Sequence, residues 1–122
     1  MTITLYGDPR TKKNSQRLVR LGARMIPLTS KAYSEYERAC LAQITETRRL
    51  LAINFPVNVK CEYFMGTRRK VDLVNLLEAT CDILVEAGVL VDDNCRIVAG
   101  HDGSRVYYDK QNPRVEIEIT MI

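Results

Sequence analysis

Residues 71–93 have the sequence VDLVNLLEATCDILVEAGVLVDD, and this stretch decides how the fold is built. Its apolar residues recur at the three- and four-residue spacing of an amphipathic helix, which the pattern predicts over residues 72–87. Asp72 is a suitable N-cap, and Gly88 is typical of the residue that ends a helix in a left-handed conformation. The remaining residues 89–93 predict an extended segment that ends in two adjacent aspartates.

The two ends of this stretch carry acidic side chains, Asp72 and Asp93, which are separated by 21 positions. A helix over residues 72–87 rises on the order of 22 Å, at about 1.5 Å per residue. If the chain reverses after it, the extended segment 89–93 runs back roughly 17 Å, at about 3.3 Å per residue. We therefore expect the acidic pair to return close to Asp72.

Outside this stretch, alternating apolar residues predict strands, and helical spacing predicts one more helix. The expected elements are strands at residues 2–6, 57–65, 97–99 and 115–121, a helix at 31–51 after the N-cap Ser30, and a short, weak hairpin at 18–21 and 23–27 around Gly22. Together these elements predict an α+β fold, in which a mixed sheet of about four strands is covered by two main helices.

The length of 122 residues predicts a single domain over residues 1–122, because the chain is too short to divide into two cores. No apolar run approaches the roughly 20 residues that cross a bilayer, and no basic leader is present, which indicates a cytoplasmic protein without membrane contact. The four cysteines are widely spaced and there is one histidine, so buried reduced thiols are favoured over a zinc site. A resident metal would therefore prefer oxygen ligands, and no motif indicates an organic cofactor.

Basic side chains are concentrated at the N-terminus. Residues 1–24 carry six Lys or Arg side chains against Asp8, although the formal charge of the whole chain is only +3. Such a segment suits a polyanion such as nucleic acid, whose phosphates exchange condensed counterions for protein charges. The candidate DNA-binding residues lie in two polar segments: Lys12, Lys13, Asn14, Arg17, Arg68, Arg69 and Lys70. A merely solvated basic loop remains an open alternative.

Carboxylates that converge beside a helix N-terminus and the basic run 68–70 would form a cation site flanked by phosphate-binding charges. Hydrolysis of a phosphodiester places negative charge on the attacking and leaving oxygens, and divalent ions held by carboxylates neutralise it. Mg²⁺, with Mn²⁺ as a substitute, suits such a site because it takes few protein carboxylates and keeps several waters. The candidate ligands are Asp72, Asp92 and Asp93. Two alternatives stay open, namely that Asp72 only caps the helix and that residues 92–94 only form a turn.

Four segments of the chain resemble the RusA-type Holliday junction resolvases, a family typical of phages and prophages. These segments are residues 7–14 (GDPRTKKN), 69–76 (RKVDLVNL), 82–84 (DIL) and 88–93 (GVLVDD). The resemblance implies a homodimeric, Mg²⁺-dependent endonuclease that makes paired nicks across branched, four-way DNA. It also implies that Asp72 and Asp93 are the essential carboxylates.

The chain departs from the family pattern at two positions of the predicted helix. Val74 stands where the family has a second aspartate, and Glu78 stands where it usually has a lysine. Positions 74, 78 and 82 form one row along a helix, and a glutamate leans towards the helix N-terminus. We therefore hypothesise that Glu78 replaces the missing carboxylate as a catalytic residue and metal ligand. The alternatives are that Glu78 is a surface residue and that Asn75, one turn from Asp72, either orients that carboxylate or faces solvent.

Three functions are consistent with these patterns. The first is resolution of four-way junctions by paired, metal-dependent phosphodiester hydrolysis. In the second, the changes at positions 74 and 78 leave a protein that binds junction DNA but cuts it weakly or not at all. The third is a structural subunit of a phage replication or packaging assembly. Metal-dependent nicking of a synthetic four-way junction separates the first function from the other two.

Overall fold

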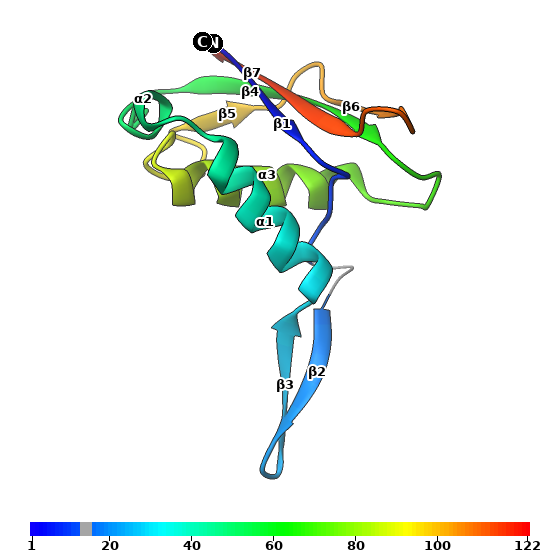
Figure 1. The fold of residues 1–122 in the computed structure, drawn as a ribbon. Coiled ribbons are helices and arrows are strands. Elements are labelled where there is room, and N and C mark those ends of the chain that lie inside the picture. The colour runs from blue at the N-terminus through cyan, green and yellow to red at the C-terminus, as the bar shows by residue number, and fades with distance from the viewer. Residues whose placement is uncertain (13–15) are drawn as a thin grey trace.

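The computed structural model describes residues 1–12 and 16–122, in which a mixed sheet carries helices on one face (Figure 1). The sheet consists of β1 (Thr2–Tyr6), β4 (Val57–Met65), β5 (Val98–Gly100), β6 (Arg105–Tyr108) and β7 (Arg114–Met121). Strand β7 lies between β1 and β4 and is antiparallel to both, whereas β5 and β6 pair in parallel with β4. The predicted α+β class is therefore confirmed, with five strands in the main sheet.

Strand β4 has the alternation that the sequence predicts for one buried face. Every second side chain from Val57 to Met65 is buried, and those between are partly exposed. The register with β7 aligns Cys61 with Ile117, both of which are fully buried. Because paired residues point to the same side of a sheet, the two strands share one apolar face, and this face receives the helices.

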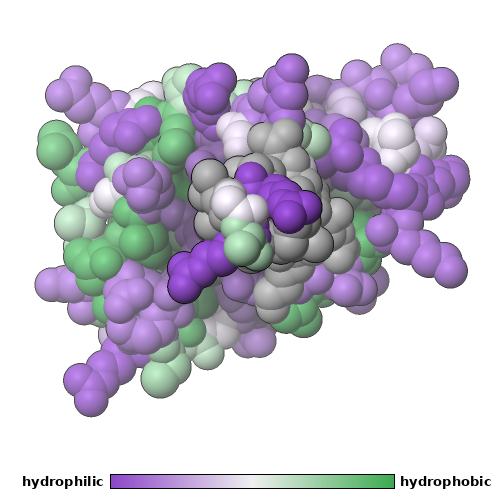
Figure 2. Space-filling view, turned by 90° about the horizontal axis from the view of Figure 1, so that it is seen from below, coloured by the Kyte–Doolittle hydropathy of each residue, from purple (hydrophilic) through white to green (hydrophobic). Residues whose placement is uncertain are grey.

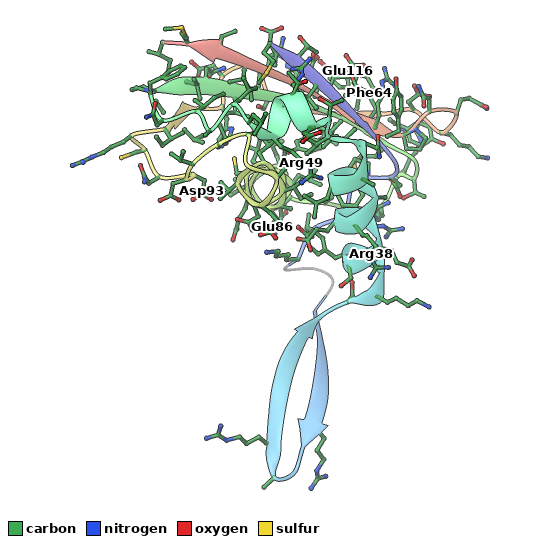
Figure 3. The ribbon with its side chains drawn as sticks, turned by 60° about the vertical axis from the view of Figure 1, so that its left-hand side comes forward. Arg38, Arg49, Phe64, Glu86, Asp93 and Glu116 are labelled. Atoms are coloured by element: carbon green, nitrogen blue, oxygen red, sulfur yellow. The ribbon has the colours of Figure 1, made fainter. Side chains whose placement is uncertain are left out.

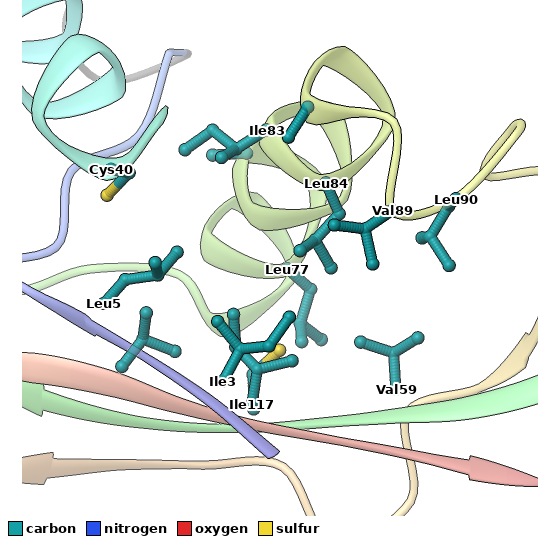
Figure 4. Packing of buried hydrophobic residues seen from close by; sticks show 14 of the residues in the cluster. Ile3, Leu5, Cys40, Val59, Leu77, Ile83, Leu84, Val89, Leu90 and Ile117 are labelled. Carbon is teal, nitrogen blue, oxygen red and sulfur yellow. The ribbon is translucent and has the colours of Figure 1, made fainter. Parts of the chain in front are cut away.

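Helix α3 (Leu73–Ala87) packs its apolar stripe against that face. Figure 4 shows Leu77 and Leu84 between the helix and the sheet, where burial of one leucine stabilises the fold by about 1.5–3 kcal/mol. The hydroxyls of Tyr63 and Thr80 form a buried hydrogen bond of 2.7 Å, so neither polar group is left unpaired. This packing fixes the rotation of α3 and turns its row at positions 74, 78, 82 and 86 outward.

Gly88 ends α3 as predicted, with a φ of +89°. A Cβ at this position would lie 2.6 Å from the carbonyl oxygen of Arg49, so only glycine fits. The chain then pairs Leu90 with Ile53 in a parallel bridge, and both side chains are buried. The extended segment is therefore used to close the core at this end of α3.

Helix α1 (Lys31–Gln43) begins as predicted, because the Ser30 hydroxyl accepts a hydrogen bond from the backbone N–H of Tyr33 at 3.2 Å. The prediction of one helix as far as residue 51 is wrong. The Thr45 side chain caps a separate short helix, α2 (Glu46–Arg49). This cap favours the start of a new helix over the continuation of α1. None of the helices in the described residues is long and apolar enough to span a membrane.

Strand β6 is the element that the sequence analysis missed. All four of its side chains are exposed, so no alternation of burial marks it in the sequence. It is held to β4 by backbone pairing and by Tyr107, whose ring stacks on Phe64 with the ring centres 5.0 Å apart. The loop before it is fixed by Ser104, whose hydroxyl accepts a hydrogen bond from the N–H of Cys61 at 3.0 Å.

A two-stranded arm projects from the body of the molecule (Figure 1). Its strands, β2 (Gln16–Leu21) and β3 (Arg24–Thr29), form a separate sheet in which they pair only with each other. Gly22 in the turn has a φ of +62°, a conformation that glycine adopts without strain. The predicted weak hairpin is therefore confirmed, and we call residues 16–29 the arm.

Burial divides the four cysteines into two classes. Cys40, Cys61 and Cys81 are buried, Cys95 is exposed, and all four thiols are free. The prediction of buried reduced thiols is therefore confirmed for three of them. It is wrong for Cys95, which follows the acidic pair at the surface.

We expect iodoacetamide at pH 8 to alkylate one thiol of the folded protein, Cys95, and all four thiols in urea. Burial raises the pKa of Cys40 to about 11, and that of Cys61 and Cys81 to about 12. Their reactive thiolate fraction at pH 8 is therefore small, and access is blocked as well. Intact mass spectrometry counts the added groups, and a Cys95→Ser variant should add none when folded. Two or more additions to the folded parent would contradict this assignment.

Candidate active site

An acidic hollow lies where the outward row of α3 meets the loop that follows the helix. Its volume is about 470 Å³, and its lining combines five carboxylates with one ammonium group and one apolar side chain. These residues are Lys12, Glu37, Asp82, Val85, Glu86, Asp92 and Asp93. Glu86 and Asp93 lie on the side of the molecule from which the arm projects (Figure 3). We call this region the acidic hollow.

Asp82 and Asp93 lie close enough to repel each other. Burial, and then the negative charge of Asp82, raise the pKa of Asp93 above its ordinary value, with smaller effects from Asp92. Two carboxylates that share a site resist simultaneous ionisation unless a cation neutralises them. Asp82 is the site residue that the sequence reasoning missed as a ligand, although it continues the row of positions 74 and 78.

Asp92 fixes the backbone of the loop that presents Asp93. Its Oδ1 accepts a hydrogen bond from the N–H of Asp93 at 2.7 Å, and its Oδ2 accepts one from the side-chain amide of Asn94 at 2.9 Å. The hydrogen bond from the Asp93 N–H, followed by that from Asn94, lowers the pKa of Asp92. The turn considered at residues 92–94 lies further along the chain, at residues 95–97, where the N–H of Ile97 donates to the carbonyl oxygen of Asn94 at 2.9 Å. Of the acidic pair, Asp93 carries the repulsion with Asp82.

Lys12 is the one basic residue among those that line the acidic hollow. Its Nζ lies 3.1 Å from Oδ2 of Asp82 and 5.7 Å from the ring centre of Tyr33. The side chain is 40% exposed, so the ammonium group remains accessible from solvent. A phosphate group that entered the hollow would therefore meet this cation among the carboxylates.

The hydroxyl of Tyr33 is a buried polar group beside the acidic hollow. Tyr33 is 1% exposed, and its Oη has no hydrogen-bond partner of acceptable geometry in the part of the chain that the structure describes. Burial, and then the charges of Glu37 and Asp82, raise the pKa of this hydroxyl. An interaction of this hydroxyl with the Glu37 carboxylate adds to the effect, so Glu37 is the polar neighbour of the Tyr33 hydroxyl.

Asp72 lies at the opposite end of α3. It occupies the N-cap position but makes no capping hydrogen bond with its side chain. The side-chain amide of Asn75 donates to Oδ2 of Asp72 at 3.3 Å, which is the orienting contact considered from the sequence. Asp72 precedes Asp82 by about 15 Å along the helix, at about 1.5 Å per residue, and does not line the acidic hollow. The structure thus brings Asp93 to Asp82, and the expected return to Asp72 is not seen.

Glu78 lies between these two ends, exposed on the outward row and one turn from Asp82. Val74, where the family has an aspartate, is 72% exposed on the same row. Within residues 1–12 and 16–122, no three acidic, histidine or cysteine side chains are grouped closely enough to hold a metal ion. The role of Glu78 as a replacement ligand therefore stays a prediction.

Asp8 ties the N-terminal loop to the segment that precedes α3. Its Oδ1 accepts a hydrogen bond from the N–H of Gly66 at 2.8 Å, and its Oδ2 accepts one from the guanidinium group of Arg69 at 2.7 Å. Arg69 also donates to the carbonyl oxygen of Pro9. We call these contacts the Asp8 latch. Arg69, predicted to bind DNA, is thus engaged in holding residues 8 and 9 beside the segment that precedes α3.

The other residues predicted to bind DNA divide into two groups. Arg68 is exposed, and its guanidinium group lies 4.0 Å from the ring centre of Tyr108, while Lys70 is exposed in the same loop. The remaining three predictions lie outside what the structure describes: Lys13, Asn14 and the side chain of Arg17.

Comparison with known proteins places the chain in one family. No curated protein matches it significantly. The model of the family described as endodeoxyribonuclease RusA matches residues 7–120, a range that includes the Asp8 latch, α3 and the whole acidic hollow. The chain therefore belongs to the RusA endodeoxyribonuclease family.

Proposed function

We propose that this chain is a structure-specific endonuclease that resolves four-way DNA junctions by metal-dependent hydrolysis of phosphodiester bonds at the acidic hollow. The observation that carries the proposal is the juxtaposition of Asp82 and Asp93 in an open hollow of a RusA-family chain. Such a pair of carboxylates is the usual protein contribution to a phosphodiesterase metal site. The four-way substrate follows from the family.

Mg²⁺ fits the residues of the acidic hollow, and we propose Asp82 and Asp93 as its ligands. Mg²⁺ is usually bound by one or two carboxylates and keeps several waters, so two aspartates suffice. The raised pKa of Asp93 reflects burial and then the negative charge of Asp82, a repulsion that a bound cation would relieve. When bound, the ion supplies neutralisation of the charge that develops on the reacting oxygens. Mn²⁺ prefers the same oxygen ligands and should substitute.

The chain's own residues position the substrate around this centre. Lys12 is paired with Asp82, and a cation that binds Asp82 would free the ammonium group to contact a phosphate oxygen. Asp92 holds the loop that presents Asp93. The alternative ligand set is the one predicted from the sequence, in which Asp72 and Glu78 act with Asp92 and Asp93. Substitution at Asp72 and at Asp82 distinguishes the two sets.

We further propose that the protein acts as a homodimer, since paired symmetrical nicks require two sites and two-fold symmetry is the common solution. Exposed apolar side chains near the C-terminus and after α2 are the proposed contacts with the partner: Leu50 is 77%, Met121 77% and Ile122 75% exposed. Light scattering after size exclusion should then give twice the chain mass of 13.9 kDa. A monomeric mass at micromolar concentration would contradict the dimer.

Cleavage of a synthetic four-way junction tests the proposed function. We expect symmetrical nicks with Mg²⁺ or Mn²⁺, none in EDTA, and little cutting of a linear duplex of the same sequence. Binding without nicking in either metal would contradict the proposal and support a junction-binding protein, which the lack of a three-ligand group in the described residues favours. Failure to bind any DNA at low salt would instead point to a structural subunit.

A further inference from the structure

We propose that the arm is a second DNA-binding element, which holds a duplex branch of the junction through Arg20 and Arg24 at its tip, away from the acidic hollow. This inference rests on the proposed function, because it names how the same substrate is held. It assigns a partner to a part of the fold that is absent from the residues lining the hollow.

The charge distribution identifies the partner. The arm, residues 16–29, contains three Arg side chains and no Asp or Glu. The formal charge of the chain is +3, so with +3 in the arm the remaining residues together carry no net charge. A polyanion is therefore attracted to the arm more than to the body, where the acidic hollow alone has five carboxylates.

The shape of the arm fits duplex DNA. Each strand has six residues, so the ribbon is about 20 Å long at about 3.4 Å per residue, and its two outer edges pair with no other strand of the described residues. An isolated two-stranded hairpin is marginally stable, which indicates that the arm acts with a partner outside the body. A two-stranded ribbon is also one of the elements that the major groove of DNA accommodates.

The tip presents its cations to solvent. Arg20 and Arg24 flank the turn at Gly22 and are both exposed, and Nε of Arg20 donates to the carbonyl oxygen of Gly22 at 3.1 Å. That hydrogen bond holds the Arg20 side chain at the end of the ribbon. Seen from below, hydrophilic side chains project from the tip of the arm (Figure 2). The arm and the acidic hollow are on the same side of the molecule, so one junction can reach both (Figures 1 and 3).

The inference separates binding from cutting. The arm carries its charge without a metal, whereas the hollow repels phosphate until a cation binds there. We therefore expect the parent protein to bind a four-way junction in EDTA. This binding should weaken steeply with salt, because each phosphate contact contributes roughly 0.9 to the slope of log K against log salt concentration.

The test is an R20Q/R24Q variant, measured by fluorescence anisotropy with a labelled four-way junction in EDTA between 50 and 200 mM salt. We expect the salt slope to fall by about 1.8 and the affinity at 100 mM salt to fall about tenfold or more. An R20K/R24K variant keeps both charges and should bind within about threefold of the parent. The matched control is R105Q/K110Q, which removes two exposed cations at the far edge of the sheet and should leave the slope unchanged.

Three results would overturn the inference. The first is parental affinity and slope in R20Q/R24Q, and the second is an equal loss in R105Q/K110Q, which would show a general charge effect. The third is a loss of junction affinity in R20K/R24K that is as large as the loss in R20Q/R24Q. Equal thermal midpoints for all variants establish that each is folded. If the parent protein binds the junction but never nicks it, the proposed function is wrong, and the DNA-binding role of the arm can still be confirmed. If the parent protein nicks the junction and R20Q/R24Q binds normally, only the proposed role of the arm is wrong.

Discussion

Replacement of Asp93 by asparagine is expected to lower the single-turnover rate of junction cleavage by about a thousandfold or more, and Asp82→Asn is expected to do the same. Each change removes one of the two carboxylates that repel each other in the acidic hollow. Loss of a metal ligand forfeits several kcal/mol of charge stabilisation in the transition state, and each 1.36 kcal/mol is tenfold in rate. Gel analysis of a labelled junction at saturating Mg²⁺ measures the rate, and anisotropy in EDTA shows that binding persists.

Two other substitutions sharpen this result. Asp102→Asn makes the same chemical change at an exposed aspartate outside the acidic hollow, and it should retain the parental rate. Asp72→Asn distinguishes the two ligand sets. A smaller loss of cleavage rate in Asp72→Asn than in Asp82→Asn supports the acidic hollow as the metal site. Complete loss of cleavage in Asp72→Asn, with activity retained in Asp82→Asn, would reject Asp82 as a ligand and favour the ligand set predicted from the sequence. Full activity in Asp93→Asn would reject both.

Gly88→Ala is expected to reduce the free energy of unfolding by about 3–4 kcal/mol, among the largest effects of a single substitution in this chain. An alanine in the left-handed region costs about 1–2 kcal/mol by itself. Its Cβ would also lie 2.6 Å from the carbonyl oxygen of Arg49, a backbone atom that cannot move aside without shifting α2. Urea denaturation followed by circular dichroism measures the loss.

Gly103 provides a control with the same backbone conformation, since its φ of +88° almost equals that of Gly88. A Cβ at Gly103 would approach Cδ of Lys60 at 2.7 Å, and this flexible side chain can swing away. Gly103→Ala should therefore cost only the conformational part, about 1–2 kcal/mol. Equal losses in the two variants would mean that the contact with Arg49 contributes nothing.

The main elements could be predicted from the sequence because their signals are local. The alternation in β4 and the apolar stripe of α3 each extend over several repeats, and Ser30 and Gly88 mark two helix boundaries by backbone chemistry. Strand β6 could not be predicted, since all of its side chains are exposed. The break at Thr45 was missed because residues 45–49 (TETRR) contain no apolar side chain whose spacing could mark the end of the helix.

The acidic site was predicted in part. A reversal of the chain after α3 follows from Gly88, and it correctly returns Asp93 to the helix. How far the chain runs back along α3 depends on where the residues after Gly88 pair. Leu90 pairs with Ile53, which is distant in the sequence, so local sequence patterns do not predict this bridge. That bridge is why the partner of Asp93 is Asp82 and not Asp72.

The Asp8 latch joins residues 58 and 61 positions apart, and this separation bears on how the protein matures. Contacts between distant residues require closure of a long loop, so they form after local structure. During synthesis, the basic arm therefore emerges well before Arg69 is available to hold residues 8 and 9. A nascent or truncated chain that ends before residue 69 would expose the cationic arm without an assembled acidic hollow. Under the proposed function, competence to cut DNA would arise only once the whole domain is complete, whereas attraction of the arm to DNA would arise first.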